Sequence, residues 1–270
     1  MTVACVIPAR YASTRYPGKP LAMLTGATGE SVSLIERSWR AAQGVSGLDS
    51  VYVATDDDRI ADAARAFGAE VLMTSSEARN GTERCAEALE ILSSQEGGDV
   101  EIIVNLQGDA PLTPPWFLEK LVAGLRGDAQ AAIATPILRC DGETLAALKA
   151  DRAAGRVGGT TAVADSKMRA LYFSKEVVPF TSEAYAPDAA TPVFHHVGVY
   201  AYRPWALRAY PHWSVGPLET LEGLEQLRFL EAGHPVLCVE VEARGAKFWE
   251  LNNPEDIPRI EAMLQEMGAP

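Results

Sequence analysis

A cluster of basic residues follows the first apolar segment of the chain, in the sequence Ile-Pro-Ala-Arg-Tyr-Ala-Ser-Thr-Arg-Tyr-Pro-Gly-Lys-Pro-Leu at residues 7–21. It contains Arg10, Arg15 and Lys19, together with the hydroxyls of Ser13 and Thr14. Guanidinium and ammonium groups bind phosphate oxygens, and hydroxyls add further donors. This set can neutralise a triphosphate and a departing diphosphate. The opposite interpretation, a solvated loop whose cations pair with surface acids, explains single residues better than the whole cluster.

The apolar pattern places this loop at the end of a strand. Residues 3–7 form a short apolar run that ends at Pro8, which is typical of a buried strand. In an open α/β sheet, the loop after the first strand is the usual phosphate-binding position. The loop has one glycine, Gly18, and matches neither the dinucleotide fingerprint nor the P-loop. Its cations would therefore supply what backbone amides supply in those folds.

The composition limits the class of protein. The chain has 270 residues, 47% of them apolar and 22% charged, which fits one large α/β domain with a small lobe. With 36 acidic and 24 basic residues the formal charge is −12, which argues against nucleic acid or a membrane as a partner. The four cysteines are far apart and lack zinc-ligand spacing, so we expect reduced core residues. The start of the chain lacks signal-peptide features, and a cytoplasmic location is predicted.

Short apolar strands alternate with amphipathic helices through the first half of the chain. This alternation predicts a mostly parallel central sheet with helices on both faces. Beyond residue 133 the pattern is less regular, and we interpret residues 140–215 as an excursion, a lid or a partner-facing lobe, within a single domain 1–270. Strands are expected at 3–7, 51–54, 71–73, 102–106, 131–136, 169–173, 193–202 and 236–241. Helices are expected after a cap at Ser31, at 60–67, 82–92 and 217–231, and after Pro254.

Seven motifs along the chain resemble those of one enzyme family, the 3-deoxy-manno-octulosonate cytidylyltransferases or CMP-Kdo synthetases. They are the loop at 7–21, VATDD (53–57), NGTERCAE (80–87), VNLQGDAP (104–111), ALYFSK (170–175), HHVGVYAYR (195–203) and PLETLEGLEQLR (217–228). The resemblance implies a nucleotide-diphospho-sugar transferase (Rossmann-like) fold and a homodimer that uses the excursion for sugar binding and dimerisation. It implies that CTP and the acidic keto-sugar Kdo react, with Mg²⁺, to give CMP-Kdo and diphosphate.

The resemblance also assigns roles to residues, with Arg10, Lys19 and Asp109 as the catalytic ones. It implies a nucleotide site formed by Ala9, Arg10, Ser13, Arg15, Lys19, Thr82 and Arg84. It implies a sugar site formed by Gln107, Lys175, His196, Tyr200, Glu219 and Glu222. The metal ligands would be Asp109 and Asn252. Taken singly, His196 in an apolar strand is more often structural, and Glu219 and Glu222 fit the wet face of a helix.

The chain departs from the family pattern at three positions. Asn252 stands where the family carries a metal-binding aspartate, so the metal site has one negative charge fewer among its ligands. Glu250 can supply this charge if the segment is extended. Ala110 stands where glutamate is common. Lys175 replaces an arginine near the sugar acid, and an ammonium attracts a carboxylate without a bidentate fork. These changes bear on the identity of the sugar more than on the reaction.

The expected mechanism is in-line attack of the anomeric hydroxyl of the sugar on the α-phosphorus, without a covalent enzyme intermediate. Alternatives remain open. The substrate can be an amino-Kdo or a nonulosonate such as sialic acid. The TDDD sequence at 55–58 formally matches the Asp-x-Asp motif of nucleotide-sugar glycosyltransferases, although helix capping explains it better. A non-catalytic nucleotide sensor would fit Asn252.

Overall fold

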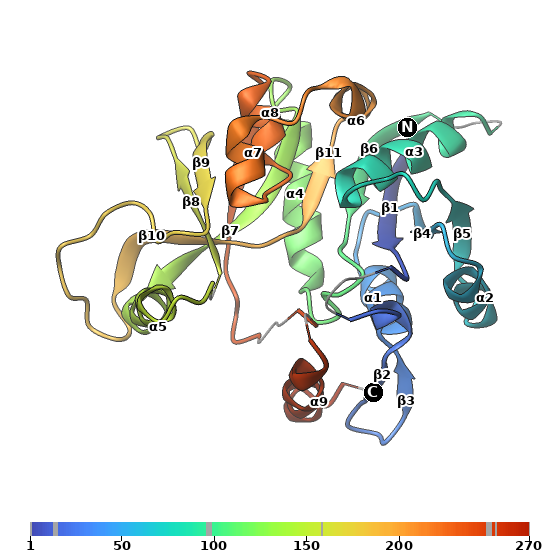
Figure 1. Cartoon of the computed structure of the whole chain (residues 1–270), viewed down its shortest axis with the longest axis horizontal. Helices are drawn as coiled ribbons and strands as arrows, with labels where there is room; N and C mark the ends of the chain where they lie inside the picture. Colours follow the sequence, from blue (N-terminus) through green and yellow to red (C-terminus); the bar gives the residue numbers. More distant parts are fainter. Residues whose placement is uncertain are drawn as a thin grey trace. The chain divides into compact units, whose positions relative to one another are not determined.

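The computed structural model describes residues 2–12, 16–95, 99–157, 159–246, 250–251 and 253–269. The predicted site residues Ser13, Arg15 and Asn252 therefore lie outside the described residues. The chain forms two compact units (Figure 1). The first unit comprises Met1–Glu119 together with Gly245–Pro270, and the second comprises Lys120–Arg244.

Four parallel strands form the sheet of the first unit, in the order β5-β4-β1-β6. The alternation of strand and helix confirms the predicted α/β architecture. Because such crossovers are right-handed, α3, which leads back from the edge strand β5 to β6, covers the face opposite α1 and α2. The elements are β1 (Thr2–Ala9), α1 (Leu34–Gln43), β4 (Ser50–Thr55), α2 (Asp58–Ala66), β5 (Glu70–Met73), α3 (Gly81–Ser93) and β6 (Val100–Asn105).

The strands of this sheet end at a common edge. Ala9, the last residue of β1, pairs with Thr55, the last residue of β4, and Asn105 at the end of β6 pairs with Val6. The apolar residues of β1 are fully buried, which fixes this register. The loops after β1 and β6 therefore leave the sheet side by side, at the position where open α/β sheets bind ligands.

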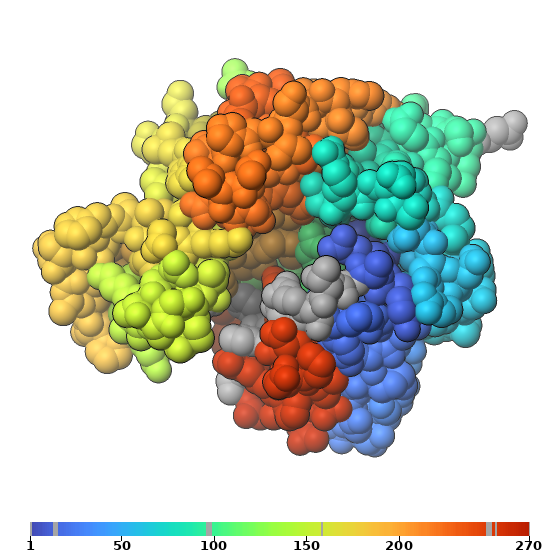
Figure 2. All heavy atoms as spheres, in the orientation of Figure 1, coloured from blue at the N-terminus to red at the C-terminus, as the bar shows by residue number. Residues whose placement is uncertain are grey.

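The C-terminal segment completes the first unit. After η3 (Pro254–Asp256), helix α9 (Ile257–Glu266) packs on the hairpin of β2 (Met23–Thr25) and β3 (Ser31–Ser33), which follows η1 (Lys19–Leu21). Figure 2 shows this contact between the red and blue ends of the chain. Its apolar core contains Leu24, Leu34, Leu251 and Ile260, and the Thr25 amide donates to Glu261 Oε1 at 2.7 Å.

The second unit contains a mixed sheet in the order β11-β7-β10-β8-β9, with β12 parallel to β7. It includes the whole predicted excursion at 140–215, whose roles in sugar binding and dimerisation stay predictions. Helix α4 (Pro115–Gly127) contains the boundary between the units. The other elements are β7 (Ile133–Asp141), α5 (Gly142–Ala153), β8 (Thr160–Ala164), β9 (Ala170–Ser174), β10 (Ala190–His196), β11 (Tyr200–Tyr202), α6 (Pro204–Ala209), η2 (Tyr210–His212), α7 (Pro217–Glu222), α8 (Leu227–Glu231) and β12 (Val236–Val241).

The state of the four cysteines can be compared directly with the sequence expectation. Cys5, Cys85, Cys140 and Cys238 are buried thiols that form no disulfide, as predicted for reduced core residues. Burial raises the pKa of Cys5 to about 12, so this thiol stays protonated and inert. Among the described residues, no helix has the length and apolar composition needed to span a bilayer.

Candidate active site

The loop after β1 is shaped by a glycine in the left-handed region. Gly18 has φ 72°, and its amide donates to the Tyr11 carbonyl at 2.9 Å, which closes the loop. A Cβ on Gly18 would lie 3.0 Å from the Tyr11 ring, so the site requires glycine. The Arg59 guanidinium covers this ring at 3.3 Å from its centroid. The turn leads directly into η1, which begins with Lys19.

The loop after β6 packs against β1 through a second glycine. A Cβ on Gly108 would lie 2.8 Å from the Pro8 carbonyl oxygen, closer than side chains approach backbone atoms. The Ser38 hydroxyl donates to the Gly108 carbonyl at 3.1 Å. These contacts place Asp109 beside the basic loop, where its Oδ2 lies 2.5 Å from Lys19 Nζ. The pair is only partly buried, so both groups remain accessible to a ligand.

We expect Gly108→Ala to destabilise the protein by about 1–3 kcal/mol, since the new methyl group must displace backbone rather than a flexible side chain. CTP affinity should fall in parallel, because the displacement moves the loops after β1 and β6. Urea unfolding and calorimetric titration with CTP measure the two effects. Gly127→Ala, where a Cβ meets nothing within 4 Å, serves as the control. Equal stability of the two variants would contradict the prediction.

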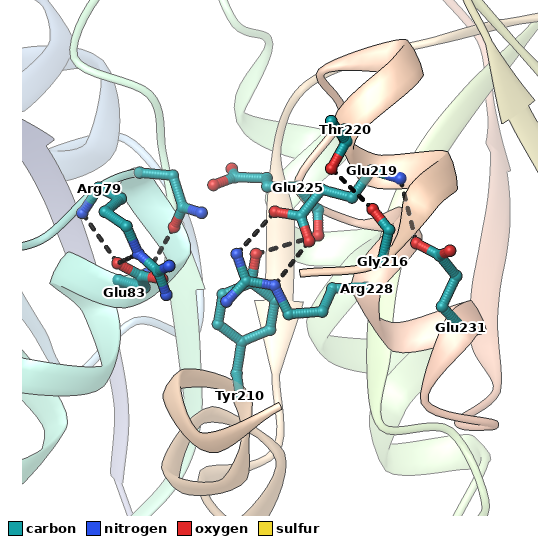
Figure 3. Close-up of polar contacts among 10 residues, drawn as sticks. Arg79, Glu83, Tyr210, Gly216, Glu219, Thr220, Glu225, Arg228 and Glu231 are labelled. Carbon is teal, nitrogen blue, oxygen red and sulfur yellow. Dashed lines mark hydrogen bonds and ion pairs between the residues drawn. The ribbon is translucent and has the colours of Figure 1, made fainter. Parts of the chain in front are cut away.

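The start of α3 forms a third wall. Asn80 caps the helix, since its Oδ1 accepts from the Glu83 amide at 2.8 Å. Gly81 lets α3 approach Gln107, because a Cβ there would lie 3.2 Å from Gln107 Nε2. Arg79 binds Glu83 with two side-chain bonds of 3.0 and 2.5 Å (Figure 3). Its side chain is nevertheless 58% exposed.

These three walls enclose a cavity of about 320 Å³ within the first unit. The lining of this cavity is strongly basic, although the protein as a whole is acidic. Its described charged residues are the four bases Arg10, Lys19, Arg79 and Arg84 and the acid Asp109. Such a concave basic site at the carboxyl edge of a parallel sheet suits a polyphosphate. Of the predicted residues, Ala9, Arg10, Lys19, Arg84, Gln107 and Asp109 line this cavity.

Arg84 and Thr82 differ from the other predicted nucleotide residues in their burial. Arg84 is 3% exposed, and its guanidinium lies 2.9 Å from Asp56 Oδ1 and 2.5 Å from Thr74 Oγ1. It therefore links α3 to the segments after β4 and β5 while lining the cavity. Thr82 is 1% exposed and is not part of the described lining. Its role in binding nucleotide stays a prediction.

Arg79 was not among the predicted site residues. It precedes the Asn80-Gly81 turn, and its position next to a helix cap gave no signal, since an exposed arginine is ordinary there. The cavity reveals it, because Arg79 and Asn80 both line it.

The described residues hold part of the predicted metal site. Asp109 lies in the cavity, and the Leu251 amide donates to its carbonyl at 2.9 Å, which brings the C-terminal segment to this edge. Glu250 is exposed next to Leu251, and Asn252 is outside the described residues. In the described ranges, no group of three His, Cys, Asp or Glu side chains is arranged to hold a metal ion.

His196 is a buried residue of the second unit. Its Nε2 lies 2.8 Å from Thr135 Oγ1, and its ring packs 4.8 Å from that of Phe173. The Thr135 hydroxyl has one proton and reaches the Val199 carbonyl at 2.9 Å, so the geometry favours a proton on His196 Nε2. Burial lowers the pKa of His196 to about 3 and also lowers that of His195. His196 is therefore neutral near pH 7.

This burial predicts a pH-dependent stability. Below the unfolded pKa of about 6.5, the unfolded chain binds protons that the folded chain excludes, so stability falls as the pH decreases. The slope is about 1.4 kcal/mol per pH unit for each such histidine. Urea unfolding at several values between pH 6.5 and 4.5 should show a smaller slope for His196→Gln than for wild type. Exposed His212→Gln is the control, and an unchanged slope in His196→Gln would contradict the interpretation.

Two further predicted sugar residues form buried hydrogen bonds. The Tyr200 hydroxyl donates to Gln226 Oε1 at 3.1 Å. Glu219 accepts two bonds from Arg228, at 2.7 and 2.6 Å, and the guanidinium lies 4.0 Å from the Tyr210 ring centroid (Figure 3). Glu219 thus lies on the inner face of α7, against α8, rather than on a wet face as the pattern alone suggested.

Glu222 and Lys175 lie together elsewhere in the second unit. The Glu222 carboxylate accepts from Ser174 Oγ at 2.6 Å, the Lys175 amide at 2.9 Å and the Tyr172 hydroxyl at 3.2 Å. The six predicted sugar residues are thus divided between the units: Gln107 belongs to the first, and Lys175, His196, Tyr200, Glu219 and Glu222 belong to the second.

Known proteins are similar to this chain over nearly its whole length. A sequence profile described as Cytidylyltransferase matches residues 4–242. The chain is 45% identical over 268 residues to the 3-deoxy-manno-octulosonate cytidylyltransferase of Maricaulis maris (strain MCS10), with 99% of each chain covered. It is 38% identical over 265 residues to the 8-amino-3,8-dideoxy-manno-octulosonate cytidylyltransferase of Shewanella frigidimarina (strain NCIMB 400), with 98% of this chain and 99% of the relative covered.

A solved structure of CMP:2-keto-3-deoxy-manno-octonic acid synthetase, complexed with CTP, superimposes with a TM-score of 0.81. It shares 31% sequence identity and covers 99% of this chain and 100% of its own. The match confirms the predicted nucleotidyltransferase fold. Together with the profile and the curated relatives, it shows that the chain belongs to the 3-deoxy-manno-octulosonate cytidylyltransferase (CMP-Kdo synthetase) family.

Proposed function

We propose that this protein is a nucleotidyltransferase that joins CTP and 3-deoxy-D-manno-octulosonate to give CMP-Kdo and diphosphate. The observation that carries the proposal is the basic cavity at the carboxyl edge of the first unit's sheet, with Lys19 and Asp109 in contact. Membership of the family supplies the reaction class, and relatives that cover the whole chain bear names of this activity.

In this proposal, the chain acts by positioning and charge neutralisation. Arg10 and Lys19 hold the β- and γ-phosphates of CTP, and we add Arg79 as a contact from the wall formed at the start of α3. The anomeric oxygen of the sugar forms a bond to the α-phosphorus as the bond to the bridging oxygen breaks. The hydroxyl proton passes to solvent, and the cations stabilise the diphosphate that leaves.

The donor set of the cavity fits a magnesium ion. Mg²⁺ is commonly bound by one or two carboxylates together with substrate phosphates and water, and Asp109 offers one such carboxylate. Asn252, and Glu250 as the alternative source of charge, are the further ligands that we propose. When bound, the ion would act as a Lewis acid and lower the pKa of the attacking hydroxyl.

The decisive experiment is a screen of acidic keto-sugars with CTP and Mg²⁺, read by diphosphate release and by the mass of the nucleotide product. Kdo should give CMP-Kdo, and CTP alone should give no diphosphate. Product from an amino-Kdo or a sialic acid but none from Kdo would reject Kdo as the substrate in favour of the alternative sugar. The name of the Shewanella relative identifies one such sugar, 8-amino-3,8-dideoxy-manno-octulosonate. No product at any Mg²⁺ concentration would favour a nucleotide sensor.

Two aspartates of the TDDD sequence, on which the glycosyltransferase alternative rests, form contacts within the protein. Asp57 caps α2, with Oδ1 accepting from the Arg59 amide at 3.0 Å, and Asp56 pairs with Arg84. These aspartates of the TDDD sequence therefore have structural partners. The predicted explanation by helix capping is confirmed for Asp57.

We further propose a cytoplasmic homodimer. Several large apolar side chains of the second unit are exposed, including Phe180 at 89%, Leu221 at 81% and Leu171 at 63%, and a subunit contact would cover such groups. Light scattering after size-exclusion chromatography measures the mass of the particle. A monomeric mass at micromolar concentration would contradict the dimer.

A further inference from the structure

The carboxylate of Glu222 accepts three hydrogen bonds from β9 and the residue after it. Glu222 is the last residue of α7, and its Oε1 accepts from the side chains of Ser174 and Tyr172. Its Oε2 accepts from the backbone amide of Lys175. A carboxylate has about four acceptor positions, and three of those of Glu222 are used within the second unit. Glu222 therefore fixes the backbone at Lys175, in addition to the sugar contact that the family resemblance implies.

The ammonium of Lys175 lies beside the glycine that ends α7. Gly223 has φ 62°, and a Cβ there would lie 3.1 Å from Lys175 Nζ. The missing side chain thus leaves the space in which the ammonium lies. Within the described part of the chain, Lys175 Nζ forms no ion pair. A half-buried cation that has no counter-ion among the described residues can receive a ligand carboxylate.

We infer that Glu222 and Gly223 are positioning residues that hold Lys175 for the carboxylate of the acidic sugar. The inference rests on the proposed function. Glu222 fixes the backbone at Lys175 from one side, and Gly223 leaves room for its ammonium from the other. Lysine needs such support because its flexible stem has many rotamers and its point charge lacks the planar fork of arginine.

The first test compares two glycines with the same backbone conformation. Gly223→Ala and Gly233→Ala both place a Cβ at positive φ, 62° and 79°, but only the first meets Lys175; the second meets nothing within 4 Å. We expect Gly223→Ala to raise the KM for Kdo at least tenfold without changing the KM for CTP. Gly233→Ala should behave as wild type. Equal KM values for Kdo in the two variants would overturn the inference.

The second test separates positioning from general damage. Turnover of Kdo is compared with that of its neutral carboxamide, and the ratio of their kcat/KM values measures recognition of the acid. Glu222→Gln and Lys175→Met should both lower this ratio at least tenfold. Glu176→Gln, which removes an exposed neighbouring carboxylate paired with Arg152, should leave it unchanged. A ratio unchanged in Glu222→Gln would show that Glu222 only joins α7 to β9.

A double variant tests whether Gly223 acts through Lys175. If Gly223 acts through the lysine, adding Gly223→Ala to Lys175→Met should not raise the KM for Kdo further. An additional tenfold rise would overturn the inference. Absence of turnover with every acidic sugar in the wild type would reject the proposed function and the inference together, whereas normal turnover with insensitive variants rejects the inference alone.

Discussion

Replacing Lys19 by methionine is expected to lower kcat/KM for CMP-Kdo formation about a thousandfold. Methionine keeps the length of the side chain but removes the charge that lies between Asp109 and the phosphates in the proposed complex. Loss of one preorganised charge at a reacting phosphate typically has an effect of this size. Steady-state assays of diphosphate release, with CTP and Kdo varied separately, measure it.

Lys167→Met is the matched control, because Lys167 is exposed and lies in the second unit. The thermal midpoint of Lys19→Met should stay near that of wild type, since the ion pair with Asp109 is partly solvent-exposed and adds little stability. If Lys19→Met retains kcat/KM within tenfold of wild type, the proposed role of the basic loop is wrong.

Asp109→Asn is expected to lower kcat by a similar factor and to raise the Mg²⁺ concentration needed for half-maximal activity. The amide keeps the shape of the side chain but removes the negative charge that both Lys19 and a divalent ion would share. Activity measured over a range of Mg²⁺ concentrations distinguishes weaker metal binding from a loss of chemistry. In the first case, high Mg²⁺ restores part of kcat.

Asp62→Asn, on the exposed side of α2, controls for a general change in charge. CTP binding measured without metal should be unchanged or tighter in Asp109→Asn, because one negative charge near the phosphates has been removed. Full activity of Asp109→Asn at low Mg²⁺ would contradict the proposed metal site.

The parallel sheet of the first unit could be predicted because its strands are short, apolar and buried on both faces. The run at residues 3–7 became β1, and the segments at 51–54 and 102–106 became β4 and β6 with shifts of two residues or fewer. Loops at the ends of such strands must share one edge. The position of Lys19 beside Asp109 follows from that geometry, although the contact itself needed the structure.

The second unit was harder to predict because its elements are short and interrupted. The run at 193–202 is two strands, β10 and β11, and the expected helix at 217–231 is two helices. Gly223 at φ 62° ends the first of them, and the apolar periodicity gave no sign of the break. Helices α4 and α5 were not predicted, since their Ala- and Gly-containing sequences have weak periodicity.

The site residues divide in the same way. Those attached to the strand ends, such as Lys19 and Asp109, could be located from sequence spacing. The contacts of Glu219 with Arg228 and of Glu222 with Lys175 depend on how short helices pack on β9 and α8, which no local pattern encodes. Arg79 belongs to this second group, because its position in the cavity depends on the packing of α3 against Gln107.

The first unit is discontinuous in sequence, and this has a consequence for synthesis. Leu251 donates to the carbonyl of Asp109, yet all of Lys120–Arg244 leaves the ribosome between the two residues. Since compact units tend to fold as they emerge, the second unit can form before the segment at Leu251 is available to bind the carbonyl of Asp109. The protein should therefore gain the ability to bind nucleotide late in synthesis, after Leu251 has been translated.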